Sequence, residues 1–161
     1  ISIALEREGQ LIAGVIYNPA SDELFTAEKG KGAYMNDRRL RVASRKTLAD
    51  SLVTTGIPHR GRANHSRFLQ EMGTLMQEVA GIRRSGSAAL DLAFVAAGRF
   101  DAYWEHGLKP WDIAAGIVMV REAGGLVSDL SGGDKFLENG DILAANTTLH
   151  KAFGGLLFTK A

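Results

Sequence analysis

The sequence predicts an α/β fold of the layered α+β kind, with an antiparallel strand meander followed by alternating helices and strands. Three observations predict it. Residues 1–42 form short runs of alternating apolar and polar side chains, separated by glycine and by a Pro-Ala-Ser-Asp segment that signals a hairpin. Residues 63–81 place apolar side chains at helical spacing. Beyond residue 81, helical and extended segments alternate, which is typical of a mixed α/β unit.

The first half of the chain is predicted from its turns and its periodicity. The meander comprises four extended segments, the last of which carries close-set glycines and an Asn-Asp turn: residues 1–8, 11–18, 23–28 and 29–42. A further strand is predicted at residues 51–58. The amphipathic surface helix that follows is predicted from six apolar residues at helical spacing: Phe68, Leu69, Met72, Leu75, Met76 and Val79.

The second half begins with a short extended piece at residues 81–86. Residues 87–98 are apolar on almost every side apart from Asp91, which predicts a helix packed on several faces. A strand is predicted at 99–107, followed by a helix from Pro110 to about Ala123. Proline suits the first helical position, and Gly124-Gly125 supplies the stop. Two short strands on either side of a Ser-Gly-Gly loop and a terminal helix complete the chain: residues 126–130, 141–146 and 148–160.

Composition limits the class of protein. The chain has 161 residues, the size of one ordinary domain, and its 19 basic and 18 acidic residues give a formal net charge of +1. This balance argues against a dedicated nucleic-acid binder, although it leaves a local basic patch open. The absence of cysteine excludes disulfides, thiolate nucleophiles and cysteine-ligated zinc, and it fits a cytoplasmic location.

The apolar runs of the sequence bear on membrane association, and its first residues bear on whether it is a piece of a larger fold. No uninterrupted apolar run reaches the ~18 residues needed to span a bilayer, so we expect no membrane association. Ile1 opens a strand pattern without a preceding charged region, so we expect no signal peptide. We interpret the chain as one cut within a larger fold and incomplete at its N-terminus.

Common catalytic motifs are absent from the sequence. There is no HExxH, no GxxxxGK[ST], no GxGxxG opening a helix after a strand and no GxSxG elbow. The Glu-Lys-Gly-Lys-Gly-Ala segment resembles a phosphate loop, but glycines around a lysine between strands favour a tight turn. No two histidines have metal-ligand spacing, so we expect surface or loop positions for all four: His59, His65, His106 and His150.

Two strand-to-helix junctions remain as candidate sites. One runs through Gly86 into a helix that begins at Ser87 and Ala88, and the other runs from Glu105 into the helix that contains Asp112. A helix N-terminus offers unpaired N–H groups and a partial positive charge, which together hold anions. Ser87 is also an ordinary cap residue, and Asp112 is also a favourable charge for a first helical turn. Together the two carboxylates and the small-residue junction form a constellation that can bind a divalent cation with a phosphate or polyol.

The residues of these junctions resemble a known family. The Trp-Asp and Glu-Ala-Gly-Gly of residues 111–125 are similar to the C-terminal motif of the inositol monophosphatase family. Residues 14–36, 83–105 and 142–146 also resemble that family, in its order, so that the resemblance covers essentially the whole chain. It implies a fold similar to that of sugar bisphosphatases, with layered helices and sheets and a magnesium site between two halves.

The resemblance implies a role for each candidate residue. The family hydrolyses phosphate monoesters with Mg²⁺ and an activated water. Asp112 would then be a Mg²⁺ ligand, Glu105 would bind substrate hydroxyls, and Gly86, Ser87 and Ala88 would contact the substrate at their helix N-terminus. Asp112 counts as both a substrate-binding and a metal residue.

The same resemblance implies that part of the site lies elsewhere. The family's Asp-Pro-x-Asp-Gly-Thr segment and its glutamate-bearing metal loop would lie upstream of Ile1, so the water-activating catalytic residues stay unknown. We expect residues 1–161 to form a single unit, the C-terminal part of the phosphatase domain, with a meander at 1–48 and a substrate- and metal-binding half at 49–161. We also expect this chain to be inactive unaided.

Several functions stay open. The leading one is hydrolysis of inositol 1-phosphate. Three alternative substrates are fructose bisphosphate, histidinol phosphate and a phosphoadenosine nucleotide. We expect the loops near Glu105 and residues 55–67 to determine which of these substrates is bound. Some bacterial relatives associate with RNA or RNA polymerase, and the supporting feature here is a basic stretch that also suits a solvated hairpin face: Arg38, Arg39, Arg41, Arg45 and Lys46. A homodimer and lithium sensitivity are family expectations.

Overall fold

A computed structural model describes residues 1–62 and 64–158, and it contains two five-stranded sheets. The first, called the meander sheet here, is antiparallel throughout in the order β1-β2-β3-β4-β5. Tight turns join its strands, which are β1 (Ser2–Arg7), β2 (Gln10–Asn18), β3 (Glu23–Glu28), β4 (Gly32–Met35) and β5 (Arg38–Arg39). The Asn36-Asp37 turn has positive φ at both residues, as a two-residue hairpin requires. The meander was therefore predicted correctly.

The second sheet, called the mixed sheet, has the order β7-β6-β8-β10-β9. β6 pairs in parallel with both β7 and β8, whereas β10 is antiparallel to β8 and β9. Its strands are β6 (Leu52–Thr55), β7 (Gly81–Arg83), β8 (Ala102–Glu105), β9 (Gly125–Ser128) and β10 (Ile142–Asn146). The parallel strands β6, β7 and β8 therefore all end at the same edge of the sheet.

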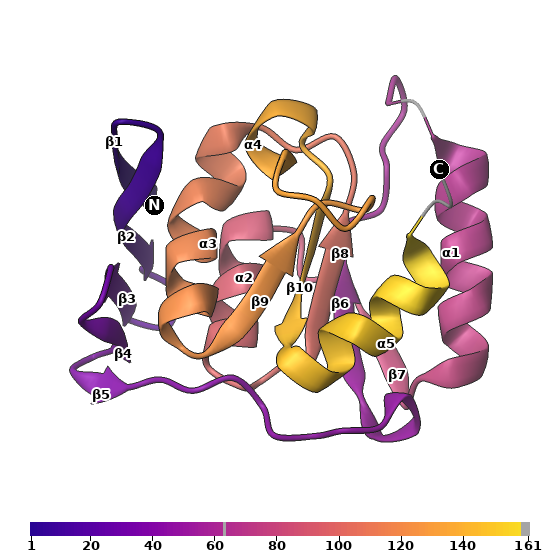
Figure 1. The fold of residues 1–161 in the computed structure, drawn as a ribbon, viewed down its shortest axis with the longest axis horizontal. Coiled ribbons are helices and arrows are strands. Elements are labelled where there is room, and N and C mark those ends of the chain that lie inside the picture. Colours follow the sequence, from indigo (N-terminus) through magenta and orange to yellow (C-terminus); the bar gives the residue numbers. More distant parts are fainter. Residues whose placement is uncertain (63, 159–161) are drawn as a thin grey trace.

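Helices cover the sheets in layers (Figure 1). α2 (Ala88–Ala96) and α3 (Pro110–Glu122) lie between the two sheets, and α1 (His65–Glu78) and α5 (Thr147–Leu157) cover the far face of the mixed sheet. A 3₁₀ turn (Leu48–Asp50) precedes β6, and the one-turn helix α4 (Phe136–Asn139) lies between β9 and β10. This confirms the mixed α/β fold class, whereas α4 was not predicted. Of the predicted helices at 63–81 and 148–160, residues 63, 159 and 160 lie outside the described range.

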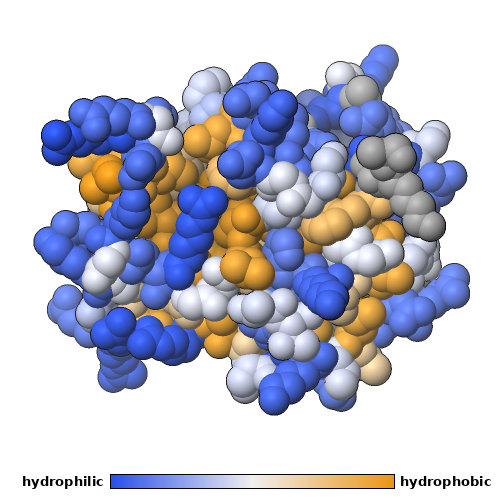
Figure 2. Space-filling view, viewed as in Figure 1, coloured by the Kyte–Doolittle hydropathy of each residue, from blue (hydrophilic) through white to orange (hydrophobic). Residues whose placement is uncertain are grey.

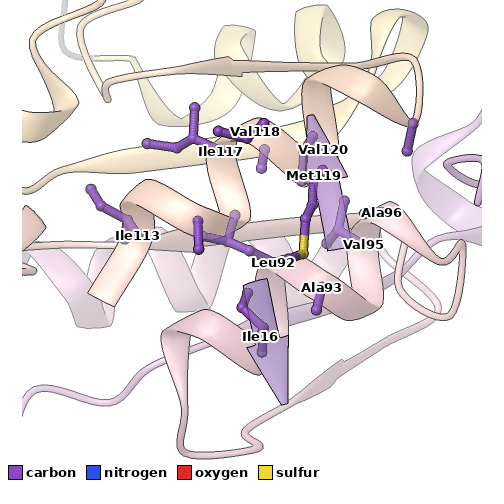
Figure 3. Packing of buried hydrophobic residues seen from close by; sticks show 14 of the residues in the cluster. Ile16, Leu92, Ala93, Val95, Ala96, Ile113, Ile117, Val118, Met119 and Val120 are labelled. Atoms are coloured by element: carbon purple, nitrogen blue, oxygen red, sulfur yellow. The ribbon is translucent and has the colours of Figure 1, made fainter. Parts of the chain in front are cut away.

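The central core forms where α2 and α3 meet the meander sheet (Figure 3). Leu92 of α2 and Ile117 and Met119 of α3 are fully buried there, together with Ile16 of β2. Two glycines allow this close approach. A Cβ on Gly116 would lie 2.4 Å from the Leu92 Cβ, and a Cβ on Gly14 would lie 2.7 Å from the carbonyl oxygen of Ala115. The packing fixes α2 and α3 relative to each other and to the meander sheet.

A second core lies between the mixed sheet and the pair α1 and α5. Trp104 and Phe153 are fully buried in it, and Phe68 stacks on Trp104 with ring centroids 6.4 Å apart. Figure 2 shows that on the face drawn the apolar patches are bordered by hydrophilic side chains. Within the described residues, no helix is long and apolar enough to cross a bilayer.

Candidate active site

A cavity of about 790 Å³ lies where the parallel strands of the mixed sheet end. Its walls come from the segments after β6, β7 and β8, from the N-terminal ends of α1, α2 and α3, and from the start of β1 and the end of β2. The carboxyl ends of parallel strands are the usual position for ligands in α/β sheets. The structure brings all the predicted site residues to this one cavity: Gly86, Ser87, Ala88, Glu105 and Asp112.

The N-terminus of α2 forms one side of the cavity. Ser87 is its N-cap, with a side-chain oxygen that accepts from the Leu90 N–H at 3.4 Å. Gly86 has a φ of +99°, a conformation that favours glycine. The cap predicted for Ser87 is confirmed. The first turn of α2 therefore lines the cavity with small residues, which leave its backbone accessible to a ligand.

The N-terminus of α3 lies on another side of the cavity. Pro110 is the first helical residue, and the backbone N–H of Lys109 donates to Asp112 Oδ2 at 3.0 Å. Ala123 ends the helix and Gly124 follows with a φ of +88°, as the sequence predicted. Asp112 is half-buried, whereas Trp111 beside it is 70% exposed. Asp112 thus stabilises its own helix start and also faces the cavity.

Glu105 occupies the end of β8, where Tyr103 holds its carboxylate and Gly56 leaves room for it. The Tyr103 hydroxyl donates to Glu105 Oε2 at 2.7 Å, and a Cβ on Gly56 would lie 2.1 Å from the Glu105 carboxyl carbon. Burial raises the pKa of Glu105, and the charges of Asp91 and Asp112 add to the rise, while the Tyr103 hydrogen bond and Arg62 oppose it. Burial also raises the pKa of Tyr103 well above its usual range.

Asp91 is a third carboxylate on the cavity wall, and it was not predicted as a site residue. It lies in the first turn of α2, is 1% exposed, and accepts from Thr54 Oγ1 at 2.7 Å and Ser85 Oγ at 2.6 Å. Burial raises its pKa, against the effect of the two hydroxyl hydrogen bonds. The signal in the sequence that could have identified Asp91 is its place as the one acidic residue in an otherwise apolar helix. Its hydroxyl partners lie outside that helix, so the helical pattern does not reveal them.

His106 lies in a loop, one of the two kinds of position that the sequence predicted for it, but its side chain is buried and not at the surface. Its side chain is 9% exposed, and its Nε2 lies 2.7 Å from Glu71 Oε2 of α1. Its Nδ1 lies 3.3 Å from Asp141 Oδ2. His150, for which a surface or loop position was predicted, lies on α5 and is partly buried, with Nε2 3.0 Å from Ser128 Oγ. Neither set of partners was visible in the sequence, because each joins segments that are far apart along the chain.

The donors for a metal ion are incomplete among the residues that the structure describes. Asp112 offers a carboxylate, the ligand type that Mg²⁺ prefers. Within residues 1–62 and 64–158, however, no three His, Cys, Asp or Glu side chains come close enough together to hold a metal ion. The chemistry of Asp112 therefore fits one ligand position but does not by itself make a site.

The Glu-Lys-Gly-Lys-Gly-Ala segment is a turn, as the sequence predicted. The backbone N–H groups of Gly30 and Gly32 each donate to the Glu122 carboxylate of α3 at 2.8 Å. These donors are engaged within the protein, and Gly30 and Gly32 do not line the cavity. The segment therefore anchors the meander sheet to α3.

Fold and site define a mixed α/β protein with a cavity at the carboxyl ends of its parallel strands, and comparison with known proteins places it more closely. The model of the inositol monophosphatase family matches residues 1–159. The chain belongs to the inositol monophosphatase family.

Individual relatives agree with this assignment. The chain is 60% identical over 152 residues to the inositol-1-monophosphatase of Mesorhizobium japonicum. The aligned residues cover 94% of this chain and 57% of that protein. It is 51% identical over 154 residues to the Nus factor SuhB of Pseudomonas aeruginosa, again with 94% and 57% covered. The chain thus spans less than two thirds of the length of these curated relatives.

Solved structures show the same fold. The extragenic suppressor protein suhB of Bartonella henselae superposes with a TM-score of 0.95 at 52% identity, over 99% of this chain and 61% of that chain. The inositol monophosphatase of Anabaena superposes with a TM-score of 0.89 at 41% identity, over 97% and 64% respectively. The sugar-phosphatase-like architecture expected from the resemblance is therefore confirmed at the level of this family's fold.

Proposed function

We propose that this chain is the substrate-binding part of a Mg²⁺-dependent phosphomonoesterase that hydrolyses inositol monophosphates to inositol and phosphate. The observation that carries the proposal is the convergence of Glu105, Asp112 and the N-terminus of α2 on one cavity. Such a cavity combines positive helix ends for an anion with carboxylates for hydroxyls and a cation. Membership of the inositol monophosphatase family supports the reaction class.

The α2 N-terminus is the proposed site for the anionic part of the substrate. Gly86, Ser87 and Ala88 leave room for close approach to backbone N–H groups, and the helix dipole favours negative charge there. Glu105 is the proposed acceptor for hydroxyl groups of the polyol. Tyr103 holds its carboxylate and Gly56 leaves room for it, so an incoming hydroxyl meets an acceptor that is already oriented.

Asp112 is the proposed ligand of Mg²⁺. Its Oδ2 accepts from the Lys109 N–H, which orients the carboxylate toward the cavity. Bound Mg²⁺ would supply a water of lowered pKa and positive charge to stabilise the leaving oxygen. The remaining ligands and the water-positioning residues are proposed to belong to a part of the protein that this chain lacks, so we propose that residues 1–161 are inactive alone.

A joined protein tests this proposal directly. It consists of residues 1–161 attached to the part of the Mesorhizobium japonicum inositol-1-monophosphatase that this chain does not cover. The joined protein is expected to release phosphate from inositol 1-phosphate only when Mg²⁺ is present, and the 161-residue chain is expected to release none. Activity of the chain alone would show that the missing ligands are not needed, and inactivity of a folded joined protein would count against the proposed reaction.

A substrate panel tests the proposed specificity. Fructose bisphosphate, histidinol phosphate and a phosphoadenosine nucleotide are the alternatives, and each is assayed with the joined protein beside inositol 1-phosphate. The highest kcat/KM is expected for inositol 1-phosphate, because Glu105 offers a fixed acceptor to a polyol. A higher kcat/KM for any of the others would assign that substrate instead.

A second candidate function is association with RNA or RNA polymerase. The relatives in Pseudomonas aeruginosa and Escherichia coli are named Nus factor SuhB. Arg38 and Arg39 of β5 are exposed, whereas Arg45 forms an ion pair with the buried Asp101 carboxylate at 3.1 Å. Salt-sensitive RNA binding that is lost in Arg38→Glu/Arg39→Glu would support this function. RNA binding that is unaffected by the two changes would show that Arg38 and Arg39 are not part of the RNA-binding surface.

Three further properties are proposed only from the family. They are a homodimer, inhibition by lithium and a cytoplasmic location. Sedimentation of the joined protein, and its activity with and without Li⁺, test the first two.

A further inference from the structure

The segment from Glu105, the last residue of β8, to Leu108, before α3, is tied down by the residues around it. The N–H of Gly107 donates to Asp141 Oδ1 at 3.1 Å, and the N–H of Leu108 donates to the carbonyl of Gly140 at 2.9 Å. From the opposite side, Arg62 Nη1 donates to the carbonyls of His106 and Gly107 at 3.0 and 2.6 Å. Every residue of the segment lines the cavity.

His106 is the side chain at the centre of these contacts. Its Nε2 lies 2.7 Å from Glu71 Oε2, and its Nδ1 lies 3.3 Å from Asp141 Oδ2, so one imidazole ring lies between two carboxylates. Glu71 is 8% exposed in its side chain, although it belongs to a surface helix. Glu71 also accepts from the indole N–H of Trp104 at 3.2 Å, one residue before Glu105.

The charges around the ring favour its protonated form. Glu71 of α1 and Asp141 before β10 lie on the two sides of the ring, and Arg62 before α1 donates to the backbone carbonyl of His106. Arg67 Nε donates to Glu71 Oε1 at 2.9 Å, so Glu71 is shared between two cationic groups. Burial of the imidazole lowers its pKa, but the Asp141 and Glu71 carboxylates outweigh burial and raise the pKa to about 9.

We propose that His106 is a positioning residue, which links Glu71 of α1 to Asp141 before β10 and thereby fixes the cavity segment that carries Glu105. The proposal rests on the proposed function in one respect, namely that Glu105 binds the substrate. The link itself is independent of the reaction. It joins α1, on the far face of the mixed sheet, to a loop that lines the cavity.

The link gives the binding site a pH dependence of known sign. His106 has a raised pKa in the folded chain, so its contribution to stability is fully present below its ordinary pKa of 6.5 and is lost as the pH rises through about 9. Deprotonation leaves a neutral ring with one N–H between two carboxylates. The KM for the polyol substrate is therefore expected to rise above about pH 9, while kcat changes less.

Substitution of His106 by Gln tests whether the link affects substrate binding more than the chemical step. In the joined protein, His106→Gln is expected to raise the KM for inositol 1-phosphate about tenfold or more, with kcat within about twofold of the starting protein. The rise of KM above about pH 9 is expected to disappear. The matched control is His150→Gln, another partly buried histidine, which lies on α5 and does not line the cavity. It is expected to leave KM and its pH profile unchanged.

Hydrogen exchange measures the link without any activity. Exchange of the Gly107 and Leu108 amides is expected to be about tenfold faster or more in His106→Gln than in the unchanged chain. If His106→Gln does not fold, Glu71→Gln provides the same measurement, since it weakens the other side of the link without touching the acceptors of the Gly107 and Leu108 amides. Faster exchange with an unchanged KM would overturn the positioning role, and unchanged exchange would overturn the link. An inactive joined protein with faster exchange would refute the proposed function while leaving the link intact.

Discussion

The Tyr103 hydroxyl donates a 2.7 Å hydrogen bond to Oε2 of Glu105, two residues further along the same strand. Side chains two residues apart in a strand lie on the same face, so the strand itself aligns donor and acceptor. Tyr103 is fully buried, and its hydroxyl is directed to the only cavity residue on β8. The arrangement fixes a carboxylate in a position where burial opposes its ionisation.

Glu105→Gln is expected to stabilise the folded chain at neutral pH. The amide oxygen keeps an acceptor for Tyr103, while the partly desolvated charge disappears. Glu105 has a raised pKa in the folded state, so its favourable contribution is present below its ordinary pKa of 4.5 and is lost as the pH rises through the folded value. We expect a gain of ~1 kcal/mol at pH 7, or about 2–4 °C in Tm, that becomes smaller toward pH 4. Thermal unfolding at both pH values checks this, and a loss of stability at pH 7 would contradict the electrostatic account.

Gly56→Ala is expected to displace the Glu105 carboxylate. A Cβ at this position would lie 2.1 Å from the Glu105 carboxyl carbon, so the side chain has to leave its bond to Tyr103. We expect a destabilisation of about 1–3 kcal/mol and a KM for inositol 1-phosphate raised about tenfold in the joined protein. Gly73→Ala is the control, because a Cβ there, in the middle of α1, meets no atom within 4 Å. It is expected to stabilise by about 0.5–1 kcal/mol without a change in KM, and equal effects of the two changes would refute the role of Gly56.

Glu122→Ala is expected to loosen the turn between β3 and β4. The change removes the acceptor for the N–H groups of Gly30 and Gly32, which costs about 1–2 kcal/mol. Urea unfolding and hydrogen exchange of the two glycine amides provide the measurement. Glu138→Ala, an exposed carboxylate of α4, is the control and is expected to stay within about 0.5 kcal/mol. Protection of both amides in Glu122→Ala would mean that they have another acceptor.

Local patterns predicted the elements because their causes are local. The extent of α3 follows from Pro110 at its start and Gly124 after its end, and the Ser87 cap follows from its place before an apolar helix. The five candidate site residues were identified from the two strand-to-helix junctions and from the family resemblance. Their convergence on one cavity depends on the parallel pairing of β6 with β7 and β8, which the periodicity of single segments does not specify.

What the sequence did not predict depends on contacts between distant segments. His106 is buried because Glu71 and Asp141 lie on either side of it, each about 35 residues away along the chain. Asp91 accepts a hydrogen bond from Thr54, 37 residues away, and Glu122 accepts from Gly30 and Gly32, 92 and 90 residues away. The one-turn helix α4 is too short for a helical period to be visible. For His106, Asp91 and Glu122, the environment of the side chain is set by a partner that is distant in the sequence, so the residue and its neighbours along the chain do not predict it.

The most direct test of the account is the activity of Asp112→Asn in the joined protein. Asparagine keeps an acceptor for the Lys109 N–H, so α3 and the fold are expected to remain intact while the charged ligand is lost. Asp134→Asn, an exposed carboxylate away from the cavity, is the control. We expect Mg²⁺-dependent release of phosphate from inositol 1-phosphate to fall at least ~100-fold in Asp112→Asn and to stay unchanged in Asp134→Asn. Full activity of Asp112→Asn with the same Mg²⁺ dependence would contradict the account.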